Sequence, residues 1–386
     1  MNKPGNSAGG RDFRPEAPTG PRSEDEVLEL LDSCFDPAPP SLRLGRGDDC
    51  AEFSVPGLLA LSTDLFLEDE HFRLSYFQPE EIGYKALAVN LSDLAAAGAL
   101  PLAFSLGLIC PRRLDKAWLR RVFQGMAALA GEYDLALSGG DISAGDKLGF
   151  CISIWGAQRQ NGRGEASAAE ISAEARLLRR GAIPGQELFV LGPADSCCLL
   201  GLPRLGLFRL ESGGREAEKS CPGACAALLR PRPQVEAGLA LASLPRPASV
   251  PCPLFVMDVS DGLARDLPRL LRGTQKKTST PGADLDFSLD LLHPELRVWA
   301  EENARTRKDR AKLLLEAALA GGEEYVLLGA AAPELLPSIR EAAAGLPVPA
   351  RLDRIGRVTG RPGLRWQGRP LEDVISVRAF DHFGVI

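Results

Sequence analysis

Histidine is scarce in this sequence, and long uncharged apolar runs are absent from it. The three histidines among 386 residues make a transition-metal site built on imidazole ligands unexpected. No apolar, uncharged window reaches the roughly 18 residues of a transmembrane helix, so no membrane span is expected. Residues 1–22 lack the apolar core of a secretory signal and are rich in Gly, Pro and Arg. We expect them to form a disordered tail.

The net charge and the spacing of the cysteines exclude further classes of function. A formal net charge of -6 argues against a general role on nucleic acid or on a membrane surface. The nine cysteines are scattered, and the spacing of Cys221 and Cys225 differs from the CxxC of metal and redox sites. We therefore expect reduced thiols and a cytoplasmic protein.

The common nucleotide-binding motifs are missing as well. No GxxxxGK[ST] loop occurs, and residues 273–282 resemble one in composition alone. GRGDDC at 45–50 lacks the third glycine of a dinucleotide fingerprint, and DHFG at 381–384 is not the DFG of protein kinases. If this chain carries out phosphate chemistry, it uses another scaffold.

Strand and helix patterns alternate along the chain. Apolar strands are predicted at 58–67, 102–109, 135–138, 148–156, 187–191 and 254–258, and a glycine turn leads into another strand at 321–328. Helices are predicted at 23–31, 81–98, 115–133 and 263–271. The polar segment 156–174 indicates a boundary between domains at 23–160 and 161–386. Segment 203–222 has no clear period and is interpreted as a surface insertion, and 273–282 as a mobile loop.

The helix predicted at 81–98 has one polar stripe. Its apolar face is formed at positions i, i+4 and i+7 by Leu87, Leu91 and Leu94. Asn90 and Asp93 share a different edge, and Glu81 and Lys85 are spaced to form an ion pair. Taken alone, the Asn–Asp edge is also explained as a solvated helix face.

Further carboxylates stand beside glycines or at the ends of predicted strands: Asp48, Asp49, Asp64, Asp93, Asp141, Asp258 and Asp261. Asp64 lies inside an apolar strand pattern, so its burial requires a partner such as a cation. If these acids converge, divalent cations must offset their repulsion, and oxygen ligands favour Mg²⁺. A polyphosphate bound through Mg²⁺ is then the expected substrate. The alternative is that each acid is a separate turn residue.

Longer motifs in the chain resemble those of thiamine-monophosphate kinases. They are GDDCAEF (47–53), STDLFLEDEHF (62–72), YKALAVNLSDLAAAGALP (84–101), SGGD (138–141), LLRRGAIPG (177–185), LLRPRP (228–233), MDVSDGLARDL (257–267), GGEEYVLL (321–328) and FDHF (380–383). The resemblance runs from about residue 23 to the C-terminus. It implies the fold of the aminoimidazole-ribonucleotide synthetase superfamily, with two α/β (α+β) domains and N-terminal sheets that pair across a homodimer.

The resemblance also implies roles for single residues. Several Mg²⁺ ions would be held by Asp49, Ser62, Thr63, Asp64, Asp93, Asp141, Asp258 and Asp261. ATP would contact Gly140, Asp141, Arg179 and Ser260. Thiamine monophosphate, the phosphate acceptor, would be positioned by His71, Glu323 and Phe380. An acid and an aromatic face suit its cationic thiazolium, and its phosphate oxygen needs no general base. On the residues alone, His71 and Phe380 are also explained by packing in the core, Glu323 by a turn, and Arg179 by a solvated pair with Arg180.

Several positions depart from the family's motifs. Glu324 and Val326 stand where the family pattern GGEDYE has Asp and Glu, and residues 142–144 replace the two Thr and Arg that often follow GGD. The metal acids are retained, but substrate identity is less closely implied. The alternatives are another ATP-using member of the superfamily, such as a purine-pathway synthetase, and a non-catalytic nucleotide-binding homologue. A selenophosphate synthetase is disfavoured because residues 1–22 contain no Cys.

Overall fold

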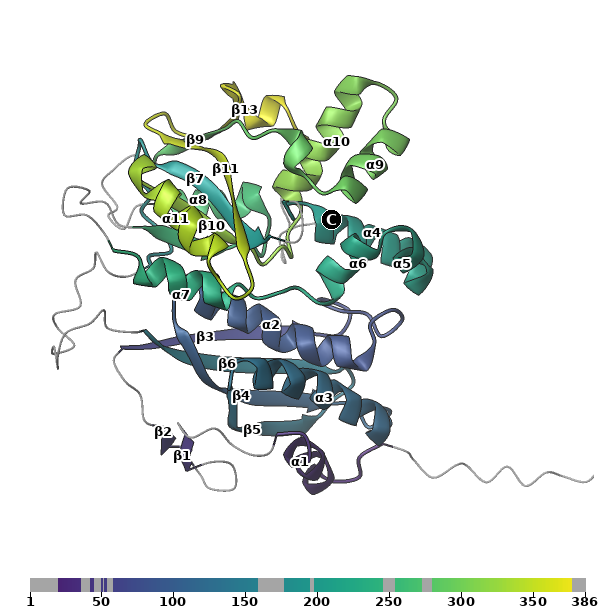
Figure 1. Cartoon of the computed structure of the whole chain (residues 1–386). Helices are drawn as coiled ribbons and strands as arrows, with labels where there is room; N and C mark the ends of the chain where they lie inside the picture. The colour runs from purple at the N-terminus through teal and green to yellow at the C-terminus, as the bar shows by residue number, and fades with distance from the viewer. Residues whose placement is uncertain are drawn as a thin grey trace, which may run out of the picture.

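The computed structural model describes residues 20–35, 42–44, 50, 52–53, 58–158, 177–194, 198–245, 254–272 and 280–376. Within these ranges the chain forms two layered units, each with its own sheet, and α2 and α7 lie between them (Figure 1). Most of the predicted tail and of the loop at 273–282 lies outside the described residues. The boundary near residue 160 lies outside them too, so these three assignments stay predictions.

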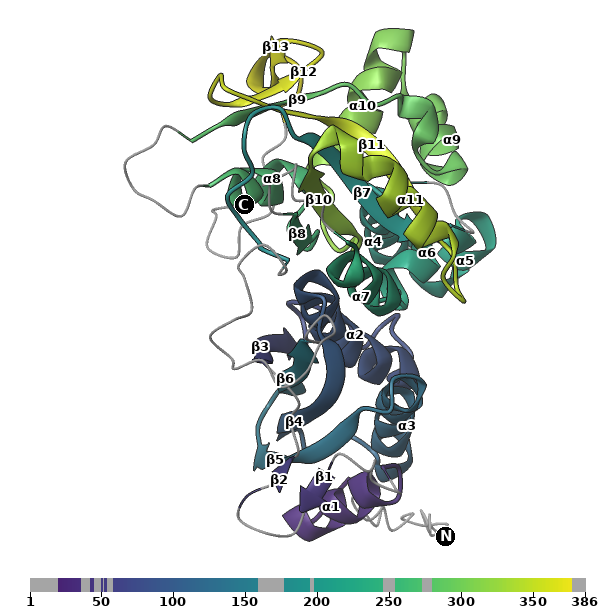
Figure 2. The ribbon, with the colours of Figure 1, turned by 60° about the vertical axis from the view of Figure 1, so that its left-hand side comes forward.

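The N-terminal unit is a sheet with helices on one face (Figure 2). Its strand order is β3-β6-β4-β5, with antiparallel pairs except for the parallel β4–β5 pair. The strands are β3 (Leu58–Leu67), β4 (Leu100–Cys110), β5 (Ala136–Ala144) and β6 (Gly149–Gln158). The helices are α1 (Glu24–Asp32), α2 (Pro79–Ala97) and α3 (Lys116–Glu132), and a small ribbon pairs β1 (Leu42–Leu44) with β2 (Glu52–Phe53).

The second unit contains a larger, mostly antiparallel sheet of order β13-β12-β9-β11-β7-β10-β8. Its strands are β7 (Glu187–Pro193), β8 (Phe255–Asp258), β9 (Gly282–Leu285), β10 (Leu327–Ala331), β11 (Ala350–Thr359), β12 (Leu364–Trp366) and β13 (Arg369–Pro370). Its helices are α4 (Leu202–Gly213), α5 (Ala217–Ser220), α6 (Pro222–Leu229), α7 (Val235–Ser243), α8 (Leu263–Leu271), α9 (Pro294–Asn303), α10 (Arg307–Ala320) and α11 (Leu336–Ala344). Among the described helices, none combines the length and apolar character needed to cross a bilayer.

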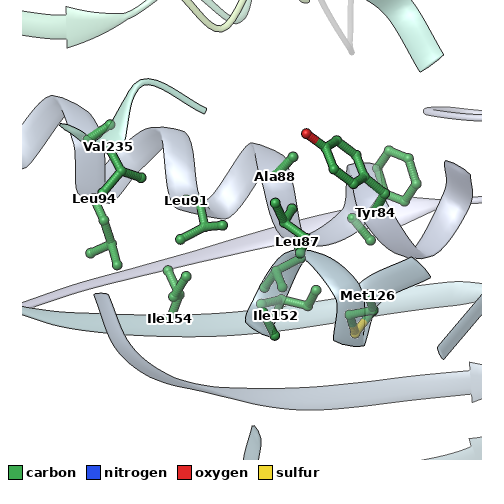
Figure 3. Close-up of a cluster of buried hydrophobic side chains, with 14 of the residues drawn as sticks. Tyr84, Leu87, Ala88, Leu91, Leu94, Met126, Ile152, Ile154 and Val235 are labelled. Atoms are coloured by element: carbon green, nitrogen blue, oxygen red, sulfur yellow. The ribbon is translucent and has the colours of Figure 1, made fainter. Parts of the chain in front are cut away.

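The apolar face predicted for α2 is confirmed. Leu87, Leu91 and Leu94 are buried and point toward Ile152 and Ile154 of β6 (Figure 3). The opposite side of α2 is also buried, because α7 packs on it so closely that a Cβ on Gly238 would lie 1.9 Å from the Ala95 carbonyl oxygen. The small side chains of α2 therefore let it join the two units.

The predicted ion pair between Glu81 and Lys85 is not the one that the structure contains. Glu81 instead pairs with Arg215 at 2.6 Å, and Lys85 pairs with Glu323. Because both partners come from the second unit, the two residues tie α2 to distant segments rather than to its own next turn.

Two segments differ from the sequence expectation. The strand predicted at 135–138 continues to Ala144, because Gly140 lets it run beside β4: a Cβ there would lie 1.9 Å from the Leu106 carbonyl oxygen. Segment 203–222 is largely helical rather than an irregular insertion. Its helix α4 packs on α6 through Gly206, where a Cβ would lie 2.1 Å from the Ala224 carbonyl oxygen.

Truncation of the buried face of α2 tests this packing. Leu91 is 0% exposed, so Leu91→Ala is expected to lower the free energy of unfolding by about 2–5 kcal/mol through lost burial and a residual cavity. The matched control is Leu28→Ala on α1, where the side chain is 42% exposed and the expected loss is below about 1 kcal/mol. Urea denaturation measures both, and equal losses would contradict the assigned core.

Candidate active site

A cavity of about 1320 Å³ lies between the two units. Its wall is built from β3, α2, residues 179 and 180, α4, the β8–α8 turn and the turn that precedes β10. These segments are far apart in sequence, so the cavity exists because α2 and α7 hold the units together.

The structure brings ten of the predicted site residues to this cavity: Ser62, Thr63, Asp64, His71, Asp93, Arg179, Asp258, Ser260, Asp261 and Glu323. Gly140 and Asp141 do not line it. They lie on β5 at the opposite edge of the sheet from β3, about 14 Å away across two intervening strands. Asp49 and Phe380 lie outside the described residues, so their roles stay predictions, as do those of Gly140 and Asp141.

The half-buried carboxylates of Asp64 and Asp93 and the buried carboxylate of Asp258 lie close to one another in the cavity wall. Burial and the charge of Asp93 raise the pKa of Asp64 to about 6, and burial also raises the pKa of Asp93. The pKa of Asp258 rises for the same two reasons, burial and the charge of Asp93. Hydroxyl groups offset part of this cost: Ser62 donates to Asp93, and Ser92 donates to Asp258 at 3.1 Å. A bound cation would relieve the remaining repulsion.

The oxygen donors of the cavity fit Mg²⁺ only when a substrate phosphate completes the coordination of the ion. Among the described residues, no group of three or more His, Cys, Asp or Glu side chains is arranged to hold a metal ion. Mg²⁺ commonly binds one or two carboxylates and completes its shell with water and substrate phosphates. The oxygens of Asp64, Asp93 and Asp258, with the hydroxyl of Ser62, are hard donors of this kind. They fit an ion that also binds a phosphate group. The Thr63 hydroxyl instead forms a hydrogen bond with the Ser153 hydroxyl at 2.8 Å, on the other face of β3.

Arginines line the neighbouring wall of the cavity: Arg179, Arg180, Arg265, Arg269 and Arg272. Asp261 pairs with Arg269 at 2.7 Å and with Arg265 at 3.5 Å. The turn that holds Asp261 is fixed by Asp266, whose carboxylate accepts hydrogen bonds from the backbone N–H groups of Ser260 (3.1 Å) and Asp261 (3.0 Å). Guanidinium groups bind phosphate oxygens in bidentate geometry, so this wall suits a polyphosphate.

A strained turn carries Glu323 into the cavity. Glu323 and Tyr325 have φ values of 69° and 48°, a left-handed conformation that is unfavourable for residues other than glycine. The fully buried amine of Lys85 donates to the Glu323 carboxylate and lies 5.5 Å from the centre of the Phe77 ring. The Tyr325 hydroxyl also donates to Glu323, at 3.4 Å. These contacts hold a carboxylate beside aromatic rings, as a cationic heterocycle requires.

His71 is oriented by the backbone of β3. The N–H of Leu67 donates to Nδ1 of His71 at 3.0 Å, so in the neutral ring the proton is on Nε2. The ring also packs 5.8 Å from the ring of Phe66. His71 is therefore both a packed residue and a lining residue of the cavity.

Sequence reasoning missed several lining or supporting side chains. The spacing along the chain predicts a local pair for Lys85, although a lysine among Leu and Ala positions of a buried helix is itself a signal of a buried ionic contact. The other three, Tyr76, Phe77 and Arg269, lie outside the motifs quoted above. The sequence also did not predict that α4 lines the cavity, because segment 203–222 shows no clear hydrophobic period.

Comparison with known proteins identifies the family. The model described as "AIR synthase related protein, N-terminal domain" matches residues 47–157. The thiamine-monophosphate kinase of Escherichia coli (strain K12) is 33% identical over 350 residues, which cover 89% of this chain and 92% of that protein. The thiamine-monophosphate kinase of Bacillus subtilis (strain 168) is 30% identical over 323 residues, which cover 82% of this chain and 86% of that protein.

Solved structures agree with these relatives. The thiamine-monophosphate kinase of Stenotrophomonas maltophilia K279a superposes with a TM-score of 0.67 at 29% identity, covering 90% of this chain and 97% of that chain. A structure described as AaThiL complexed with AMPPCP and TMP gives a TM-score of 0.63 at 25% identity, covering 93% and 95%. The two-domain α/β fold implied by the resemblance is confirmed. The chain belongs to the thiamine-monophosphate kinase family.

Proposed function

We propose that this protein transfers the γ-phosphate of ATP to thiamine monophosphate, with Mg²⁺, and so forms thiamine diphosphate and ADP. Family membership supports the proposal, and so does the AMPPCP and TMP complex of a relative. The observation that carries it is the division of one cavity into two regions. One region has the clustered carboxylates of Asp64, Asp93 and Asp258 with arginines, and the other has the Glu323 carboxylate among aromatic rings.

The chemistry needs positioning more than proton transfer. Mg²⁺, when bound, would neutralise the charge that develops on the transferred phosphoryl group. Arg179 and Arg269 would orient phosphate oxygens, while Glu323 faces the thiazolium and His71 lies beside it. A phosphate oxygen of thiamine monophosphate forms the new P–O bond to the γ-phosphorus as the bond to the ADP oxygen breaks. That oxygen is already ionised near neutral pH, so no side chain has to act as a general base.

We also infer that the protein is a homodimer whose N-terminal sheets pair. The sheet face opposite α2 and α3 exposes apolar side chains of β3, among them Leu61, which is 66% exposed, with Leu59 and Leu65. Exposed leucines in a row on a sheet are the kind of surface that an interface covers. Pairing on this face would give Gly140 and Asp141 of β5 a route to an ATP site shared between subunits.

A cytoplasmic location is part of the proposal. The seven cysteines in the described residues are all free thiols, which suits a reducing compartment. The substrates ATP and thiamine monophosphate are water-soluble, which is consistent with that compartment.

The two residues that depart from the GGEDYE motif, Glu324 and Val326, do not line the cavity. Glu324 is fully buried, and its Oε1 accepts hydrogen bonds from the N–H groups of Gly201 (3.0 Å) and Gly322 (3.2 Å). Val326 is buried in the core of the second unit. The departures at these two positions therefore alter the support of the turn, whereas Glu323 keeps its place in the cavity.

Asp93→Asn tests the metal-dependent activity. Coupled ADP release is measured with thiamine monophosphate, thiamine and aminoimidazole precursors as acceptors, and the wild type is expected to be active with the first. Losing one carboxylate charge at the base of the cavity is expected to lower turnover by about a hundredfold or more. The variant is also expected to lose the rise in melting temperature that ATP and Mg²⁺ give the wild type.

The control for Asp93→Asn is Asp146→Asn, because Asp146 is exposed and does not line the cavity. It is expected to keep wild-type turnover. Near-normal activity of Asp93→Asn would overturn the metal assignment. A wild type that binds ATP but releases no ADP with thiamine monophosphate would identify a binding protein rather than a kinase.

Leu61→Arg tests the inferred dimer. A charge in the centre of the exposed leucine row is expected to convert a dimer into monomers, measured by light scattering after size-exclusion chromatography. Leu28→Arg on α1, also at an exposed leucine, is the control and is expected to leave the dimer intact. A wild type that is monomeric at high concentration would contradict the inference.

Glu324→Gln tests the buried carboxyl. Burial raises the pKa of Glu324 from its ordinary 4.5 to about 8. A carboxyl with a raised pKa stabilises the fold below pH 4.5, and this contribution is lost as pH rises toward 8. The variant is therefore expected to lose less stability than the wild type between pH 5 and pH 8, by urea unfolding. Exposed Glu334→Gln is the control, and parallel pH profiles of Glu324→Gln and wild type would contradict this result.

A further inference from the structure

One face of helix α4 forms a continuous stripe along the cavity. Arg204, Leu207, Phe208 and Glu211 occupy positions i, i+3, i+4 and i+7, and all four line the cavity. The other face of α4 is buried through Leu202, Leu205 and Leu210. Because Gly206 packs directly on α6, the helix is held in one orientation and its stripe is directed at the cavity.

The stripe changes character along its length. At its first turn, Arg204 donates to the carbonyl oxygen of Ala320 at 2.9 Å, next to the turn that carries Glu323. In the middle, Leu207 and Phe208 are 40% and 57% exposed. At the last turn stands the carboxylate of Glu211. Seven residues of helix separate the first and last of these groups by about 10 Å.

Glu211 is held in place from the N-terminal unit. The Tyr76 hydroxyl donates to its Oε1 at 3.1 Å, and Nε of Arg73 lies 3.6 Å from the same atom. Within the described residues, both contacts of this carboxylate are made through Oε1. Its Oε2 can therefore accept a hydrogen bond from a bound ligand.

The order of groups along α4 indicates the direction of a bound substrate. The first turn of α4 lies beside residues 320–323, and the backbone N–H of Glu323 donates to the carbonyl oxygen of Ser260 at 2.8 Å. This end is therefore next to the β8–α8 turn, where Asp258 and Asp261 line the cavity and the phosphate belongs. The part of the substrate farthest from its phosphate must then lie toward the last turn of α4.

We propose that Phe208 and Glu211 bind the aminopyrimidine ring of thiamine monophosphate and determine specificity for it, an inference that rests on the proposed function. The Phe208 ring stacks on the flat face of the heterocycle. The Glu211 carboxylate accepts a hydrogen bond from the exocyclic amine. Leu207 covers the edge of the ring nearer the thiazolium. The cavity-facing stripe of α4 is therefore part of the substrate site, whereas the rest of segment 203–222 does not line the cavity.

The first test uses Phe208→Ala and Phe208→Tyr. Loss of the stacked ring is expected to raise both the KM and the dissociation constant for thiamine monophosphate about tenfold. The KM for ATP is expected to stay within about twofold, and Phe208→Tyr to restore binding to within about threefold of wild type. The control is Val298→Ala on α9, where an exposed apolar side chain is truncated away from the cavity, and wild-type constants are expected for it.

The second test uses Glu211→Gln and an acceptor in which hydrogen replaces the exocyclic amine. The wild type is expected to bind thiamine monophosphate about tenfold more tightly than this analogue, and the variant to lose most of that preference. Glu216→Gln is the charge-matched control, because Glu216 is exposed and pairs with Lys219 on the surface.

The outcomes separate this inference from the proposed function. If the wild type releases ADP with thiamine monophosphate and both variants bind it with unchanged affinity and selectivity, the α4 assignment is wrong and the kinase proposal stands. A rise confined to the KM for ATP also overturns the assignment. If the wild type shows no activity with thiamine monophosphate, the proposed function itself fails.

Discussion

Folding brings several carboxylates close together, and the packing of the rest of the structure has to overcome their repulsion. Asp64 and Asp93 come from the N-terminal unit, whereas Asp258 ends a strand of the second unit. Burial raises the pKa of all three carboxyls, and the charge of Asp93 raises the pKa of Asp64 and Asp258 further. Packing of the two units therefore works against electrostatics at their junction, and the buried contact of α2 with α7 must outweigh it. An arrangement that is unfavourable when empty is well suited to take up cations and the phosphates that accompany them.

Much of the N-terminal unit was predictable because its signals are local. The helix at 81–98 and the strand at 58–67 follow from hydrophobic period, and the structure places α2 and β3 within two residues of those limits. The short predicted strand at 135–138 was wrong at its end, since Gly139 and Gly140 normally indicate a turn. Here the missing side chain permits close approach to Leu106 instead, which is a long-range contact that a single sequence does not reveal.

In the site, too, local sequence signals were predictable and long-range contacts were not. Motif resemblance located ten residues that reach one cavity, because their identities are set by chemistry. It did not locate α4, whose contribution comes from one stripe of a helix that otherwise packs on α6. Nor did it locate the true partner of Lys85, because Glu323 is 238 residues away. Tertiary packing decided both, so neither could be read from spacing along the chain.

The burial of Lys85 has a further consequence for the behaviour of the whole molecule. Its amine has no access to solvent and is bound to a turn of the opposite unit. Acylating reagents, and enzymes that acetylate lysine, cannot reach it while the two halves stay together. The rate at which the Lys85 amine is acylated therefore reports how often the two units separate.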